Sequence, residues 1–190
     1  MMNINEGLFI YINQHMQNSV LDMIMPMITH FGGFIWLLLI VLAIFLYAKV
    51  TKRDALKKVA AIALVALLFS DLIALLLKQI VQEPRPFMSL ENVRLLIPES
   101  DPCSFPSGHA TSTLAVVSIF LLNMENLAKK HHVIIDIALL IFAIVIMFSR
   151  IYVGVHYPFD VLCGALIGIA GALIVNKYKD KILSLLERII

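Results

Sequence analysis

Five long apolar runs restrict what this chain can fold into more than any other feature. They cover residues 34–48, 59–77, 110–124, 133–148 and 157–175. A helix needs roughly 20 apolar residues to cross about 30 Å of hydrocarbon, and each run can approach that length by extending into its flanks. Since 61% of the 190 residues are hydrophobic, the chain exceeds the roughly half that is usual for soluble domains. We therefore predict an all-α, polytopic membrane helical bundle in which residues 1–190 form a single domain.

The first 30 residues do not continue this pattern. Their apolar stretches are interrupted by Asn13, Gln14, Asn18, Asp22 and Pro26. They also lack the basic start and the small-residue cleavage site of a signal peptide. We expect two short amphipathic helices at the membrane interface here. A sixth span is the alternative to this arrangement of five transmembrane helices.

Basic residues gather on one side of the predicted spans. Two of the loops and the segment after the fifth run hold Lys49, Lys52, Arg53, Lys57, Lys58, Lys129, Lys130, Lys177, Lys179, Lys181 and Arg188. Cytoplasmic loops are enriched in Lys and Arg, so we expect a multi-pass plasma-membrane protein with these segments in the cytoplasm. The opposite side holds only Lys78, Arg85, Arg94 and Arg150. Because the basic clusters lack interleaved stacking aromatics, we expect no nucleic-acid partner.

Three short motifs lie at the expected outer ends of the spans, and the first runs from Lys78 to Pro86. Lys78 and Arg85 are two helical turns apart. Pro84 and Pro86 end the helix and redirect Arg85 over its end, so both cations can reach one anion. Basic residues that merely snorkel to the interface are the alternative explanation.

The second motif is Pro106-Ser107-Gly108-His109. Ser107 is suited to cap a helix that begins near Gly108, which leaves free backbone N–H groups pointing outward. Glycine permits close approach, so this helix start is a ready anion site, with His109 beside it in the first turn. A simple turn and cap would give the same pattern.

The third motif is Ser149-Arg150 followed by His156 and Asp160. Asp160 lies four residues beyond His156, and Pro158 is well placed at the start of the last helix, so the carboxylate can orient the imidazole. Such a pairing makes a nitrogen nucleophile or base out of a histidine. This spacing is common by chance, but all three motifs lie on one side of the membrane, where they can converge.

In this order the motifs resemble those of the type 2 phosphatidic acid phosphatase superfamily: Lys-x6-Arg-Pro, Pro-Ser-Gly-His and Ser-Arg-x5-His-x3-Asp. All three match in full over residues 78–160. Within the superfamily, the Glu-Pro-Arg-Pro-Phe run at residues 83–87 and the small size are similar to the bacitracin-resistance type of undecaprenyl-diphosphate phosphatase. Membrane members commonly have six spans, so the interrupted amino-terminal segment departs from the family pattern.

The resemblance implies a metal-independent lipid phosphatase without a cofactor. His156 would attack phosphorus and form a phosphohistidine, Asp160 would orient it, and His109 would protonate the departing oxygen and then activate water. The phosphoryl oxygens would be held by Lys78, Arg85, Ser107, Gly108 and Arg150. We expect hydrolysis of a polyprenyl diphosphate to the monophosphate at the outer membrane face. Phosphatidylglycerophosphate or phosphatidate is the alternative substrate.

Two other uses of these residues compete with hydrolysis. His109, His156 and Asp160 have the chemistry to bind zinc or iron, but the surrounding cations would repel a metal ion, so we expect none. A transporter or lipid-binding protein that recognises phosphate would explain the cations but not the paired His156 and Asp160.

A few further residues carry weaker expectations. Cys103 and Cys163 are expected as free thiols, with a disulfide as the alternative. Asp71, about two turns below Lys78, is a candidate to pair with it. The last span contains small residues that suit close helix packing or a homodimer face, namely Gly164, Gly168 and Gly171.

Overall fold

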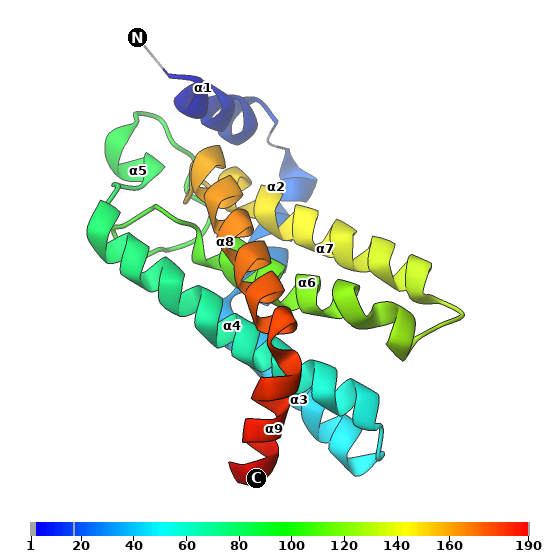
Figure 1. Ribbon diagram of the computed structural model, residues 1–190. Coiled ribbons are helices and arrows are strands. Elements are labelled where there is room, and N and C mark those ends of the chain that lie inside the picture. Colours follow the sequence, from blue (N-terminus) through cyan, green and yellow to red (C-terminus); the bar gives the residue numbers. More distant parts are fainter. Residues whose placement is uncertain (1–2, 17, 190) are drawn as a thin grey trace.

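The computed structural model describes residues 3–16 and 18–189, most of which are helical (Figure 1). The helical elements are α1 (Ile4–Ile10), the π-helical η1 (Tyr11–His15), α2 (Ser19–Thr29), the 3-10 turn η2 (His30–Gly32), α3 (Phe34–Val50), α4 (Asp54–Val81), α5 (Pro86–Ser89), α6 (Gly108–Leu127), α7 (His132–Tyr152), α8 (Pro158–Lys177) and α9 (Lys179–Ile189). Within the described ranges no strand forms, and the β pairing is limited to an isolated bridge between Pro84 and Cys103. The all-α prediction is confirmed.

Four helices, α4, α6, α7 and α8, are each long and apolar enough to cross a membrane. α3 has 17 residues and passes the same test only together with residues 19–32, from which it is bent by 60°. The structure thus holds four or five candidate spans, in agreement with the five apolar runs. The described amino-terminal residues form the short helices α1 and α2 instead of a sixth span.

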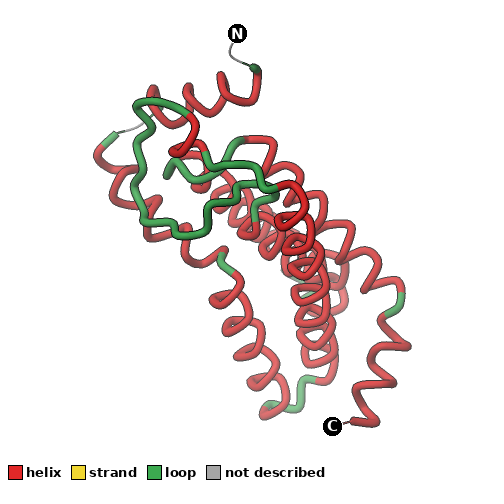
Figure 2. Tube along the Cα trace, turned by 90° about the vertical axis from the view of Figure 1, so that its left-hand side faces the viewer, coloured by secondary structure: helices red, strands yellow, loops and turns green. Residues whose placement is uncertain are grey.

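α6 lies at the centre of the bundle and packs against α4, α7 and α8 (Figures 1 and 2). α8 approaches it closely, because a Cβ on Gly164 would strike the carbonyl oxygen of Ser107 and one on Gly168 would strike that of Thr111. Close packing through small residues is therefore confirmed. Gly164, Gly168 and Gly171 are buried inside this chain, so they offer no face to a second copy. A homodimer stays a prediction.

A buried carboxylate of α4 has a different partner from the expected one. Ser112 of α6 donates a 2.7 Å hydrogen bond to Asp71, whereas Lys78 binds Asp101 and the carbonyl oxygen of Cys103. The predicted pairing of Asp71 with Lys78 is wrong. Lys78 lies in the last turn of α4 and extends beyond the helix end, while Asp71 faces the neighbouring helix.

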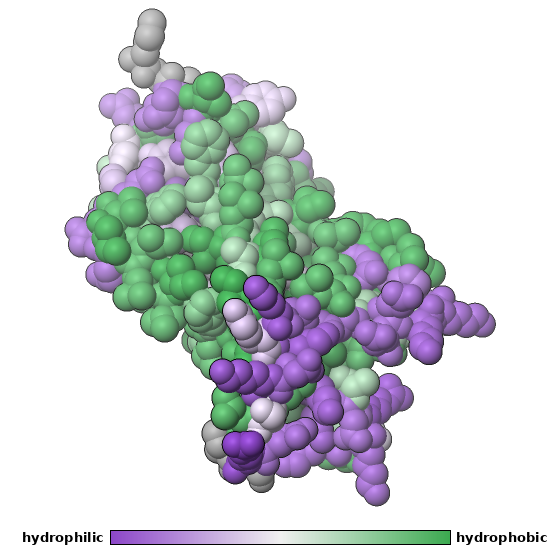
Figure 3. All heavy atoms as spheres, in the orientation of Figure 1, coloured by the Kyte–Doolittle hydropathy of each residue, from purple (hydrophilic) through white to green (hydrophobic). Residues whose placement is uncertain are grey.

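The two ends of the bundle differ in composition. Polar side chains gather at the end formed by α9 and the α3–α4 and α6–α7 turns, which is purple in Figure 3, and apolar side chains cover the middle of the face shown. The opposite end is covered by α1, α2, α5 and the long loop of residues 90–107, drawn as the large green loop of Figure 2. This covered end carries all three sequence motifs.

Asn13 of η1 links the loop of residues 90–107 to the end of α7. Its buried side chain donates 3.0 Å hydrogen bonds to the carbonyl oxygens of Arg94 and Tyr152, and accepts one from the Arg94 N–H at 2.9 Å. Gly154 follows α7 with a φ of +89°, and a Cβ there would lie 2.5 Å from the Arg94 carbonyl oxygen. Only glycine adopts this conformation readily, so the loop packs directly on the turn between α7 and α8.

Candidate active site

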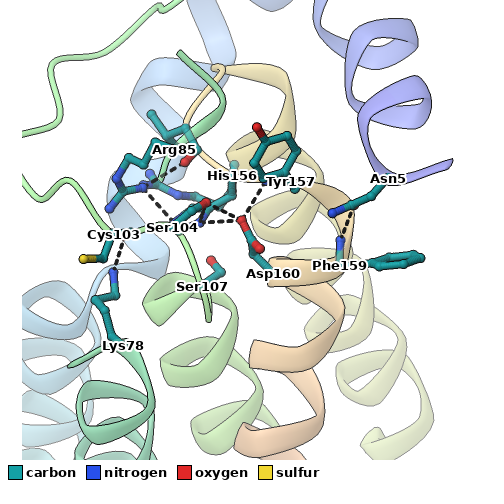
Figure 4. Close-up of polar contacts among 12 residues, drawn as sticks. Asn5, Lys78, Arg85, Cys103, Ser104, Ser107, His156, Tyr157, Phe159 and Asp160 are labelled. Atoms are coloured by element: carbon teal, nitrogen blue, oxygen red, sulfur yellow. Dashed lines mark hydrogen bonds and ion pairs between the residues drawn. The ribbon is translucent and has the colours of Figure 1, made fainter. Parts of the chain in front are cut away.

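The predicted site residues come from the ends of five helices, α4 to α8, and from the turn between α7 and α8 (Figure 4). Lys78 lies in the last turn of α4, and Arg85 immediately precedes α5. Ser107, Gly108 and His109 form the start of α6. Arg150 lies in the last turn of α7, His156 in the turn that follows, and Asp160 in the first turn of α8.

His156 contacts the side chains of Arg85, Ser104 and Asp160. The residue is 2% exposed, and its Nε2 lies 3.2 Å from Nη1 of Arg85. A guanidinium only donates hydrogen bonds, so Nε2 must present its lone pair and the ring proton must reside on Nδ1. On the Nδ1 side lie Asp160 Oδ2 at 3.5 Å and Ser104 Oγ at 3.4 Å. The nitrogen with the free lone pair therefore faces Arg85.

Asp160 is held rigidly on the other side of the imidazole. Its Oδ2 accepts a 2.8 Å hydrogen bond from the Tyr157 N–H and a further one from the Ser104 hydroxyl. Pro158 occupies the first turn of α8, as predicted from its fixed φ. The contact to His156 is longer than a usual hydrogen bond, so Ser104 stands between the carboxylate and the ring as a shared partner.

The environment of His156 keeps its imidazole uncharged. Burial lowers the pKa of His156 well below its usual range, and the positive charges of Arg150, Arg85 and Lys78 lower it further. Burial and nearby like charge both disfavour the protonated ring. The side chain is consequently neutral near pH 7, as a nitrogen nucleophile requires.

The start of α6 differs from the expected cap in one respect. Ser107 is the N-cap residue, but its hydroxyl makes no capping bond, so the prediction that its side chain caps the helix is wrong. Instead its N–H binds the carbonyl oxygen of Asp160 at 3.0 Å, and its buried hydroxyl has no hydrogen-bond partner among the described residues. The space beside Gly108 is open, since a Cβ there would meet no atom within 4 Å.

Arg150 and His109 complete the predicted group. The Arg150 guanidinium is buried, donates a 2.9 Å hydrogen bond to Thr29 of α2, and leaves Nε without a partner among the residues described. His109 lies within electrostatic range of Arg150, Arg85 and Lys78. A Cβ on Gly33 would lie 3.2 Å from His109 Nε2, so the start of α3 borders this imidazole.

Three residues of the loop 90–107 contact the predicted site residues and were missed in the sequence. Ser104 joins His156 to Asp160. Asp101 accepts from Lys78 at 2.6 Å and lies 3.4 Å from Arg85, while Glu99 lies 3.5 Å from Arg85 and 3.4 Å from Arg150. The available signal was charge complementarity, because both carboxylates lie in the loop that precedes Pro-Ser-Gly-His on the side of the motif cations. Cys103, in the same segment, and Cys163 are both free thiols.

The comparisons with known proteins agree with this geometry. The model of the PAP2 superfamily matches residues 59–183. The undecaprenyl-diphosphatase BcrC of Bacillus subtilis (strain 168) is 34% identical over 163 residues, which cover 86% of this chain and 77% of that protein. A crystal structure of a PAP2-type phosphatidylglycerolphosphate phosphatase from Bacillus subtilis superposes with a TM-score of 0.78 at 26% identity, covering 94% of this chain and 85% of that one.

A second solved structure extends the likeness. The crystal structure of Aquifex aeolicus LpxE superposes with a TM-score of 0.74 at 28% identity, covering 93% of this chain and 96% of that one. The family match extends from α4 into α9 and includes all three motifs. The chain belongs to the PAP2 superfamily and is a multi-pass membrane phosphatase.

Proposed function

We propose that this phosphatase hydrolyses a polyprenyl diphosphate of the undecaprenyl type to the monophosphate, through a phosphohistidine at His156. The observation that carries the proposal is the orientation of that side chain: a buried, neutral imidazole presents Nε2 toward Arg85 and keeps its Nδ1 proton toward Asp160. The similarity to BcrC, named an undecaprenyl-diphosphatase, supports this substrate class.

In the first half-reaction, the Nε2 lone pair of His156 attacks the terminal phosphorus. A nitrogen–phosphorus bond forms, the bridging phosphorus–oxygen bond breaks, and the polyprenyl monophosphate departs. His109, protonated once the negatively charged diphosphate is bound beside it, donates a proton to the departing oxygen. The positive charge that develops on His156 is stabilised by Asp160, whose Oδ2 lies 3.5 Å from Nδ1.

Charge neutralisation is the main work of the surrounding groups, because phosphoryl transfer depends chiefly on positioning and on stabilising the equatorial oxygens. Arg85, Arg150 and Lys78 supply positive charge. The partnerless Ser107 hydroxyl and the open approach beside Gly108 add donors at the start of α6.

In the second half-reaction, water replaces the lipid product. His109, now neutral, takes a proton from the water, the hydroxide attacks the phosphohistidine, and the nitrogen–phosphorus bond breaks. Inorganic phosphate is released and His156 returns to its neutral form. The full cycle consumes one water molecule for each diphosphate hydrolysed.

The proposed reaction takes place at the extracytoplasmic face. The site lies at the end of the bundle opposite the lysine-rich turns and α9, and lysine-rich segments are retained in the cytoplasm. A second candidate substrate is phosphatidylglycerophosphate, which the structural similarity to the phosphatidylglycerolphosphate phosphatase of Bacillus subtilis favours.

The test is phosphate release by the purified full-length protein in detergent with EDTA, from undecaprenyl diphosphate, phosphatidylglycerophosphate and phosphatidate in parallel. We expect the highest kcat/KM for the polyprenyl diphosphate. His131→Ala, at an exposed position near the start of α7, is the matched control for His156→Ala. A preference for either glycerophospholipid would refute the proposed substrate, and dependence on added metal would refute the proposed mechanism.

A further inference from the structure

Each cation of the site is bound to a carboxylate of the same short segment. Asp101 Oδ2 lies 2.6 Å from Lys78 Nζ and 3.4 Å from Arg85 Nη2. Glu99 Oε2 lies 3.5 Å from Arg85 Nη2 and 3.4 Å from Arg150 Nη2. Two carboxylates two residues apart therefore bridge three cations, as the oxygens of a bound phosphoryl group would.

Burial distinguishes the two sides of these contacts. The side chains of Arg85 and Arg150 are each 2% exposed, whereas those of Glu99 and Asp101 are 20% and 42% exposed. The carboxylates belong to the irregular loop of residues 90–107, and the cations lie at or near helix ends. A displacement of the carboxylates toward solvent would therefore require less rearrangement than a displacement of the cations.

The carboxylates also leave part of the site unsatisfied. The buried Ser107 hydroxyl and Arg150 Nε have no hydrogen-bond partner among the described residues. A phosphoryl group has more acceptor oxygens than one carboxylate, so it can bind the cations and these two donors together. Buried polar groups without partners are unfavourable, so exchanging a carboxylate for a phosphoryl group satisfies donors that the loop leaves free.

We propose that Glu99 and Asp101 occupy the phosphoryl-binding cations as internal anions, so that a phosphoryl ligand binds by displacing them. The returning carboxylates then promote release of the phosphate product. This part in product release rests on the proposed function, but the competition itself depends only on the contacts above.

The test measures anion binding by the full-length protein in detergent, with inorganic phosphate and the non-hydrolysable diphosphate analogue methylenediphosphonate as probes. Isothermal titration gives Kd for the wild type, Glu99→Gln and Asp101→Asn. Glu91→Gln replaces an exposed carboxylate of the same loop and is the matched control. Asp101→Asn, at the more exposed position, keeps the test available should Glu99→Gln fail to fold.

We expect phosphate to bind each variant about tenfold more tightly than the wild type, the factor that corresponds to 1.4 kcal/mol of competition removed. Methylenediphosphonate should gain by a similar factor, because both anions displace the same carboxylates. Glu91→Gln should leave both constants unchanged. Unchanged or weaker phosphate binding in both carboxylate variants would overturn the proposal.

Thermal unfolding separates this role from a purely structural one. Without ligand, Glu99→Gln should unfold at a lower temperature, because buried guanidiniums lose a counterion, and saturating phosphate should restore it by mass action. A lower unfolding temperature that phosphate does not restore would contradict the proposal. Tighter phosphate binding in a protein that hydrolyses no lipid diphosphate would support this inference and refute the proposed function instead.

Discussion

Asp160→Asn tests how much the charge of the carboxylate contributes to the reactivity of His156. The substitution keeps the size of the side chain but places an amide where the carboxylate now faces Nδ1 of His156 at 3.5 Å. The Tyr157 and Ser104 hydrogen bonds both go to Oδ2, the same oxygen that faces Nδ1, so an amide oxygen that keeps them also stays beside the ring, and the NH₂ group takes the place of Oδ1. The Nδ1 proton then still faces an acceptor, but the negative charge that stabilises a positively charged phosphohistidine is lost.

The expected magnitude follows from these contacts. Losing the charge of a charged hydrogen-bond acceptor costs about 1.5–3 kcal/mol. This corresponds to a loss of roughly 10–10² in kcat. Ser104→Ala removes the shared partner but leaves the carboxylate, so its loss should be smaller, no more than about tenfold.

The assay is kcat for phosphate release from undecaprenyl diphosphate, with Asp180→Asn at an exposed position of α9 as the matched control. Phosphate-induced thermal stabilisation reports whether each variant keeps a folded site. A folded Asp160→Asn enzyme that retains kcat within a few-fold of the wild type would refute the proposed role of the carboxylate charge.

Three further predictions concern protonation, leaving groups and sidedness. Because the pKa of His156 lies below its ordinary value, about 6.5 in an unfolded chain, the acid limb of the rate profile that His156 controls should lie below pH 6.5; an acid limb above that pH would contradict this assignment. The unfolded chain binds more protons below pH 6.5, so His156 should also make stability fall as the pH decreases through that value, and His156→Ala should flatten this part of a denaturation series. His109→Ala should reduce the rate more for phosphatidate, which releases an alkoxide, than for a diphosphate, which releases a stable phosphate anion. Equal losses on both substrates would mean that His109 binds phosphate and does not protonate the leaving group. In a Cys163→Ala background, Cys103 should react with an impermeant maleimide in intact cells, whereas an Asn126→Cys thiol in a variant lacking both native cysteines should not; the reverse labelling would invert the topology.

The sequence was sufficient to predict the spans and which helix ends carry the motifs. The apolar runs and the prolines that end or begin helices are local features, so the positions of Arg85 and Asp160 followed from them. The four-residue spacing of His156 and Asp160 predicted that the carboxylate can lie near the imidazole, and the two side chains lie 3.5 Å apart.

The loop of residues 90–107 could not be predicted in the same way. Residues 90–107 have no helical or strand periodicity, and their conformation depends on distant contacts such as that of Asn13 with Arg94. Glu99, Asp101 and Ser104 therefore received no role from the sequence. For Ser107 the position at the start of the helix was right, but its hydroxyl makes no capping bond.

The central claim is a covalent phosphoryl group on His156. The most direct measurement is rapid acid-free denaturation of enzyme mixed with polyprenyl diphosphate labelled with ³²P in its terminal phosphoryl group, followed by alkaline peptide mapping. We predict acid-labile, base-stable label on the peptide that contains His156, no label in His156→Ala, and a loss of kcat on the order of 10⁴ or more in that variant. Label on the peptide that contains His109, or turnover by His156→Ala near that of the wild type, would contradict the proposed mechanism.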